Sequence, residues 1–111
     1  MKIAYKVWLD SNGKAFGGGP YQLLRKVERT GSLWKAAAEM GMSYSKAWRL
    51  MRDLEKRLNF PLLERHAGGA SGGGSFITPK ARDLLDRYEK FQKDVERVLE
   101  KIYKKHFGSL K

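Results

Sequence analysis

Residues 30–58, TGSLWKAAAEMGMSYSKAWRLMRDLEKRL, decide the fold of this chain. Ser32 is suited to cap a first short helix, and Gly41 supplies the left-handed conformation that ends such a helix. Ser43 is suited to cap a second helix over residues 44–58. Two short helices joined by a tight turn form a helix-turn-helix, whose second helix enters the major groove of DNA. The stretch therefore predicts a DNA-binding motif.

Each of these helices has a face suited to packing. Small residues on the first helix allow a close approach to a neighbouring helix, and apolar residues on the second recur at helical spacing. We expect the core to receive Ala36, Ala37 and Ala38 from the first helix and Ala47, Met51, Leu54 and Leu58 from the second. Trp34 is expected in the core or at its rim, with contact to the DNA backbone as the alternative.

Polar, basic and aromatic side chains remain at the start of the second helix. Arginine and lysine suit the acceptors of guanine in the major groove, and hydroxyl groups reach phosphates. The predicted DNA contacts are Lys35, Ser43, Tyr44, Ser45, Lys46, Trp48, Arg49 and Arg52. Two readings stay open for Trp48, which either stacks with Tyr44 at the DNA-facing end or packs against the rest of the domain.

Upstream of this motif the chain predicts a β-hairpin and a helix. Apolar residues alternate over positions 2–9, and the sequence DSNG at 10–13 is typical of a tight turn. A return strand is expected from Ala15, followed by a helix over residues 20–29. The glycines at 17–19 lack the Gly-Lys-Ser/Thr ending of a phosphate-binding loop, so a turn is the better interpretation.

Downstream, two short strands at 62–65 and 76–77 predict a wing around the loop HAGGASGGGS at 66–75. A slim, uncharged loop can donate backbone amides to phosphates or enter a minor groove. We expect Arg65 at the base of the wing, together with Gly72, Gly73 and Gly74, to contact DNA. A hairpin tip without a role in binding is the alternative.

The last third of the chain predicts one long helix over 79–107, capped by Thr78. Its apolar stripe is longer than a domain of this size can cover, so a second copy is expected to cover the outer part. The predicted dimerisation residues are Leu84, Tyr88, Phe91, Val95, Val98 and Ile102. A monomer whose helix folds back over the core is the alternative.

Composition narrows the class of protein. The 111 residues carry a net charge of +11, which favours a polyanionic partner such as DNA. There is no cysteine, and the two histidines lie in unrelated segments, so no metal site, cofactor or enzymatic activity is expected. No stretch has the length and apolarity of a signal peptide or membrane span, so we expect a cytoplasmic protein.

The expected fold is mainly α with small β-hairpins: a winged helix-turn-helix over 1–78 and a long dimerisation helix over 79–111. The segments GSLWKAAAEMGMSYSKAWRLM, PLLER and GGASGGGSFITPKARDLL resemble the N-terminal domain of the molybdate-dependent, ModE-type transcriptional regulators. The resemblance covers about residues 5–91, and the LysR-type regulators share the architecture more distantly.

This resemblance implies a homodimer that binds operator DNA through the recognition helix and the wing. In the full regulators oxyanion sensing belongs to modules that follow the dimerising helix. No molybdate-binding module is present in this chain, so molybdate sensing is not expected of it.

Three functions fit the pattern to different degrees. A sequence-specific transcriptional regulator is favoured, and a non-specific architectural DNA-binding protein is the main alternative. They differ in whether Arg49 and its neighbours discriminate between bases. A winged helix that binds only protein is disfavoured by the basic residues retained on the second helix.

Overall fold

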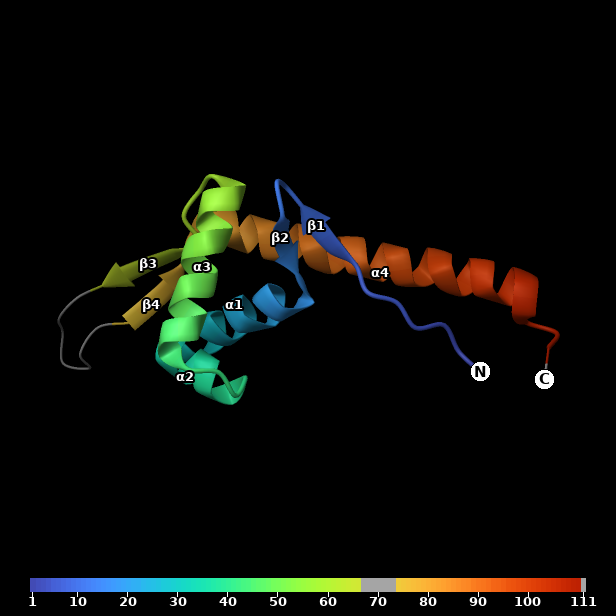
Figure 1. The fold of residues 1–111 in the computed structure, drawn as a ribbon, viewed down its shortest axis with the longest axis horizontal. Helices are drawn as coiled ribbons and strands as arrows, with labels where there is room; N and C mark the ends of the chain where they lie inside the picture. The colour runs from blue at the N-terminus through green and yellow to red at the C-terminus, as the bar shows by residue number, and fades with distance from the viewer. Residues whose placement is uncertain (67–73, 111) are drawn as a thin grey trace.

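The computed structural model describes residues 1–66 and 74–110. Helices α1 to α3 gather around the first turns of α4, whose outer part extends away from them (Figure 1), and the molecule measures 60 × 27 × 22 Å. The elements in chain order are β1 (Trp8–Asp10), β2 (Lys14–Gly17), α1 (Gly18–Thr30), α2 (Leu33–Glu39), α3 (Tyr44–Leu58), β3 (Leu63–His66), β4 (Gly74–Ile77) and α4 (Pro79–Phe107).

The predicted capping residues are found at the start of both helices of the helix-turn-helix. The Oγ atom of Ser32 accepts a hydrogen bond from the backbone N–H of Lys35 at 3.1 Å, and that of Ser43 accepts one from Lys46 at 3.2 Å. Gly41, between the helices, has φ +69°, a conformation that favours glycine. Helix α3 therefore begins and ends where the sequence predicts.

The core lies between α1, α2, α3 and the first turns of α4. Its fully buried side chains include Leu23, Leu24, Val27, Leu33, Ala36, Ala37, Ala47, Leu54, Leu62 and Leu85. Two expectations about packing were wrong. Ala38 is exposed, because it lies on the outer side of α2, and Trp34 is 64% exposed and therefore outside the core. Leu58 is only partly buried, at the end of α3.

Strands β3 and β4 form an antiparallel hairpin in which Leu63 pairs with Ile77 and His66 with Gly74. This is the described part of the wing. Thr78 joins its base to α4, because its Oγ1 donates to the carbonyl of Pro61 at 2.8 Å and accepts from the N–H of Ala81 at 3.1 Å. The wing and the long helix thus leave the core from one shared junction.

Helix α4 has two adjacent faces with different surroundings. Tyr88 is 2% exposed and packs edge-on against Phe16, with ring centroids 5.1 Å apart. The prediction of Tyr88 as a dimerisation residue was wrong, since its ring is already inside the chain's own core. Leu84 is partly buried against the same core. Because the outer part of α4 points away from the core, the folded-back alternative is also wrong.

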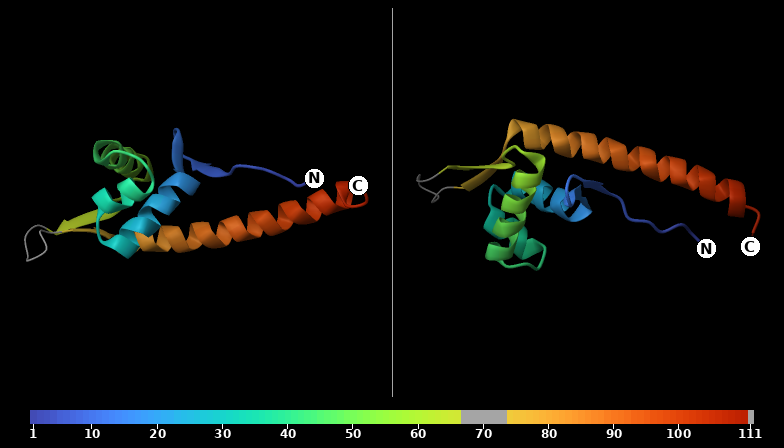
Figure 2. Two further views of the ribbon diagram at one scale, coloured as in Figure 1. Left: turned by 90° about the horizontal axis from the view of Figure 1, so that it is seen from below. Right: turned by 45° about the horizontal axis from the view of Figure 1, so that its top comes forward.

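The N-terminal strand is shorter than predicted. Only residues 8–10 pair with β2, whereas residues 1–7 form an extended segment, here called the arm, that follows α4 toward its C-terminal end (Figure 2). The alternating pattern predicted a strand from residue 2, but β2 is too short to reach it. Across residues 1–66 and 74–110, no helix is long and apolar enough to cross a membrane.

Candidate nucleic-acid interface

The first turns of α3 present a row of polar and aromatic side chains to the solvent. The helix buries Ala47, Met51 and Leu54 against the core, which leaves the opposite face outside. That exposed face carries six of the predicted contacts: Tyr44, Ser45, Lys46, Trp48, Arg49 and Arg52. Ser43 is also exposed and caps the helix, and Lys35 is exposed on the first turn of α2. The structure brings these residues to one side of the domain.

The basic groups on this side differ in their partners from the basic groups of α1. Among the described residues, Lys35, Lys46, Arg49 and Arg52 form no ion pair. On the far side, Arg25 binds Asp86 at 3.1 Å and Glu89 at 3.2 Å. Positive charge is thus paired with carboxylates around α1, whereas on α3 it is left available where an anion can approach.

Two further carboxylates pair with the basic groups of α1. Glu28 joins Arg25 to Arg82, with distances of 3.1 and 3.2 Å. Glu39 accepts a hydrogen bond from Arg29, and this bond holds the pKa of the Glu39 carboxyl below its ordinary value. The hydrogen bond from Arg25 to the hydroxyl of Tyr21 is the main cause that raises the pKa of Arg25.

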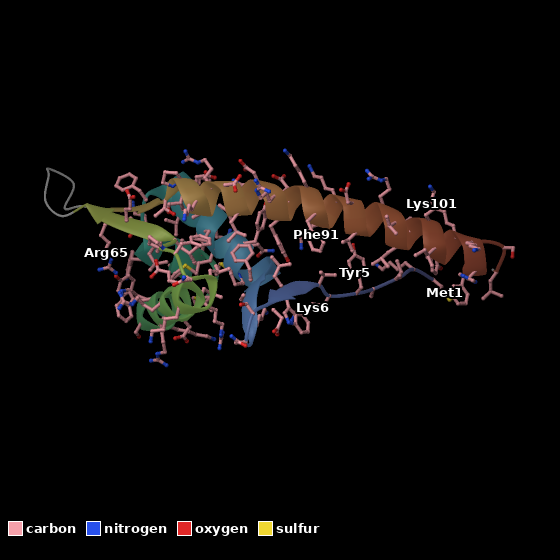
Figure 3. All side chains as sticks on the ribbon, turned by 90° about the horizontal axis from the view of Figure 1, so that it is seen from above. Met1, Tyr5, Lys6, Arg65, Phe91 and Lys101 are labelled. Atoms are coloured by element: carbon pink, nitrogen blue, oxygen red, sulfur yellow. The ribbon has the colours of Figure 1, made fainter. Side chains whose placement is uncertain are left out.

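The base of the wing contacts α3, the predicted recognition helix, through one arginine. Arg65 on β3 donates a hydrogen bond from Nη2 to the hydroxyl of Tyr44, and its Cζ lies 5.7 Å from the centre of the Tyr44 ring. Figure 3 shows Arg65 at the end of the molecule that carries the wing, far from the outer part of α4. A guanidinium held over the start of α3 adds a fifth cation to the exposed row.

Trp48 is 41% exposed and does not stack on Tyr44. The guanidinium of Arg52 lies over its ring, with Cζ 5.1 Å from the centroid. Trp48, Arg52 and Arg65 line a small hollow of about 120 Å³ between α3 and β3. Of the two readings left open for Trp48, the stacking on Tyr44 is not formed; instead each ring pairs with an arginine, which presents apolar surface and positive charge together.

A second attachment holds the wing to the far end of α3. One carboxylate oxygen of Glu55 accepts from the backbone N–H of Leu62 at 2.7 Å and from that of Leu63 at 3.4 Å. Sequence reasoning missed Glu55 because its partners are backbone groups seven and eight residues away. An acidic residue on the half-buried side of a basic helix was the only available signal.

Gly74 has a structural role that the sequence did not reveal. A Cβ built on Gly74 would lie 2.7 Å from the carbonyl oxygen of Gly31, and the neighbouring N–H of Ser75 donates to that same oxygen at 3.0 Å. The wing therefore approaches the turn between α1 and α2 closely at this point. Gly72 and Gly73, the other predicted wing contacts, lie outside the described residues.

Comparison with known proteins agrees with this architecture. The family model described as "Bacterial regulatory helix-turn-helix protein, lysR family" matches residues 21–82. The chain is 32% identical over 103 residues to the molybdenum-pterin-binding protein MopB of Rhodobacter capsulatus. The matched region covers 93% of this chain and 38% of MopB. It is 36% identical over 75 residues to the transcriptional regulator ModE of Haemophilus influenzae, covering 68% of this chain and 29% of that protein.

Among solved structures, the DNA-binding domain of BenM in complex with benA site 1 DNA matches with a TM-score of 0.56 and 22% identity. The match covers 82% of this chain and 94% of that one, which shows the shared fold. The chain spans about a third of the length of the curated relatives described above. The family model shows that the chain belongs to the lysR family of bacterial regulatory helix-turn-helix proteins, and within it the helix-turn-helix is similar to that of ModE.

Proposed function

We propose that this protein is a sequence-specific DNA-binding transcriptional regulator that acts as a homodimer. The observation that carries the proposal is the row of basic side chains without ion pairs on the exposed face of α3, beside the guanidinium of Arg65. The similarity to ModE of Haemophilus influenzae, named a transcriptional regulator, supports it, as does the fold shared with a DNA-bound domain.

Each residue has a role in this proposal. Lys46 and Arg49 reach base edges in the major groove, where guanine offers two acceptors to a basic side chain. Lys35, the hydroxyls of Ser43 and Ser45, and the guanidinium of Arg65 bind phosphates and thereby set the position of α3 on the duplex. Trp48 and Arg52 follow on the next turns of α3, where an apolar ring can meet the methyl group of thymine.

The dimer is proposed from the free face of α4. Phe91 is 39% exposed, Val98 51% and Ile102 49%, and these residues lie along one stripe beyond the core. An apolar stripe on a helix that projects into solvent is stabilised when a second copy covers it. A two-fold pair of recognition helices would then bind two half-sites in DNA.

Charge favours antiparallel pairing of the two α4 helices. Residues 101–107 contain three lysines and no carboxylate, whereas residues 86–92 contain two acidic and two basic groups. In a parallel pair the three lysines would face the same three lysines of the second copy. In an antiparallel pair centred on the stripe they lie level with the balanced segment, which avoids that repulsion.

The test is selection from a random pool of duplex DNA by the purified protein at about 150 mM salt, where weak phosphate binding is suppressed. We expect a two-fold symmetric motif with half-sites about one helical turn, or a small multiple of it, apart. Retention without any motif would identify a non-specific architectural protein instead. No retention at all would contradict DNA binding by this chain alone.

A further inference from the structure

The arm, residues 1–7, is an extended segment whose backbone is almost unpaired. It is fixed to α4 at both ends: the hydroxyl of Tyr88 donates to the carbonyl of Val7 at 3.1 Å, and the hydroxyl of Tyr103 donates to that of Met1 at 2.8 Å. Between these anchors, among the described residues, the backbone of residues 2–6 makes no hydrogen bond. Figure 3 shows Met1, Tyr5 and Lys6 alongside the outer part of α4.

The sequence of the arm is nevertheless that of a strand. Apolar Ile3, Tyr5 and Val7 alternate with Lys2, Ala4 and Lys6, which is the period of a half-buried strand. Ile3 and Val7 are partly buried, whereas the even-numbered residues and Tyr5, which is 46% exposed, lie open to solvent. The pattern therefore predicts a strand whose pairing partner is missing from the single chain.

We infer that the partner is the arm of a second copy, so that the two arms form an antiparallel β-ribbon across the dimer. This inference rests on the antiparallel pairing of α4 proposed above. On α4, the face that holds the arm (Tyr88, Tyr103) lies roughly a quarter turn from the exposed stripe (Phe91, Val98, Ile102). The two-fold axis of an antiparallel helix pair then keeps both arms on the same side of the pair.

Length and position agree with this arrangement. The arm spans about 20 Å, and α4 rises about 22 Å between Tyr88 and Tyr103. The middle of the arm thus lies within about one residue of the middle of the stripe, where the two-fold axis passes. Paired helices are about 8–10 Å apart and paired strands about 4.8 Å, so each arm needs to move only about 2 Å toward the axis.

Side-chain chemistry selects the register. With Tyr5 opposite Tyr5 of the second copy, Ile3 lies opposite Val7, which places apolar and aromatic pairs on the face toward the helices. On the outer face, Lys6 lies opposite Ala4 and Lys2 opposite Trp8. A ribbon centred on Ala4 would instead place Lys2 opposite Lys6, and like charges in that position repel.

The experiment uses the absence of native cysteine. Ala4→Cys and Lys6→Cys change exposed side chains, and their Cα atoms would be about 4.5–5.5 Å apart across the ribbon, within the range for a disulfide. Under mild oxidation, we expect a mixture of the two variants to form the mixed disulfide several-fold faster than either variant forms its own. A mixture of Lys6→Cys with Ser11→Cys, which lies in the hairpin turn, is the matched control and should not cross-link.

A second measurement needs no cysteine substitution and no cross-link. The backbone amides of residues 2–6 should exchange with solvent at least about tenfold more slowly in the dimer than in a monomeric Val98→Glu variant. If sedimentation shows a dimer while the mixed disulfide does not form and these amides stay unprotected, the ribbon is wrong and the proposed dimer stands. If the unmodified protein sediments as a monomer, the dimer and the ribbon are both wrong.

Discussion

The guanidinium of Arg65 donates a hydrogen bond to the hydroxyl of Tyr44, which joins the base of the wing to the first turn of α3. Tyr44→Phe removes this bond and keeps the ring under the guanidinium. We expect the affinity for a selected DNA site to fall by about 0.5–1.5 kcal/mol, the usual value of one hydrogen bond, as measured by fluorescence anisotropy. Tyr21→Phe, which removes a hydroxyl on the far side of the domain, should leave DNA affinity unchanged.

Arg49 is the exposed cation on α3 that we expect to discriminate between bases. Arg49→Ala should lower the affinity for a selected site by about 1–3 kcal/mol and relax the sequence preference at one base pair of each half-site. Competition binding with single-base variants of the site measures both effects. The matched control is Arg97→Ala, whose side chain pairs with Asp94 on α4. Equal weakening on every DNA sequence would assign Arg49 to phosphate instead.

Alanine substitutions at Gly74 and at Gly19 should change the free energy of unfolding in opposite directions. At Gly74 a Cβ would lie 2.7 Å from the Gly31 carbonyl, so the backbone must shift, and we expect the free energy of unfolding to fall by about 1–3 kcal/mol. At Gly19, in the first turn of α1, a Cβ meets nothing within 4 Å, and alanine should stabilise the helix by up to about 1 kcal/mol. Denaturant unfolding of both variants checks the pair. Unchanged stability in Gly74→Ala would show that the wing base is not held against that turn.

The exposed stripe of α4 is expected to carry the dimer. Replacing Val95 and Val98 together with glutamate places two charges in the proposed interface and should give a monomer in sedimentation velocity, with weaker binding to a two-fold site. Lys90→Gln and Lys93→Gln together, at exposed positions of α4, give the same change in net charge and should leave the dimer intact. An unchanged sedimentation coefficient in the glutamate variant would contradict this interface.

Glu39 should make the stability of the folded domain depend on pH in the acid range. The hydrogen bond from Arg29 lowers the pKa of Glu39 from its ordinary value of 4.5, so the unfolded chain takes up this proton more readily than the folded one. The resulting stabilisation is complete above that value and is lost as the pH falls through the lower, folded-state value. From about pH 5 to about pH 3, the melting temperature should therefore fall less steeply in Glu39→Gln than in the unmodified protein. Because the pair is exposed, about 1 M salt should reduce the difference.

The sequence predicted those elements whose signals are local. Ser43 caps α3, Thr78 caps α4, and both helices begin and end at the predicted residues. Caps, helical spacing and a terminal glycine act within one or two turns of chain, so they can be found without knowledge of the fold.

What the sequence did not predict depends on pairs that are distant in the chain. Arg65 and Tyr44 are 21 residues apart, and Arg25 and Asp86 are 61 apart. The error at Tyr88 has the same origin. A stripe on a helix shows that a residue is apolar, but only the position of Phe16 shows that the core of the same chain covers it.

The two attachments between α3 and the wing have a thermodynamic consequence. Arg65 holds the start of the helix, and Glu55 holds the strand that follows its end, so the recognition helix and β3 are fixed relative to each other before any ligand arrives. A preorganised binding surface loses little conformational entropy when a complex forms. Loosening either attachment should therefore make the entropy of association less favourable, even where no contact to the ligand has been removed.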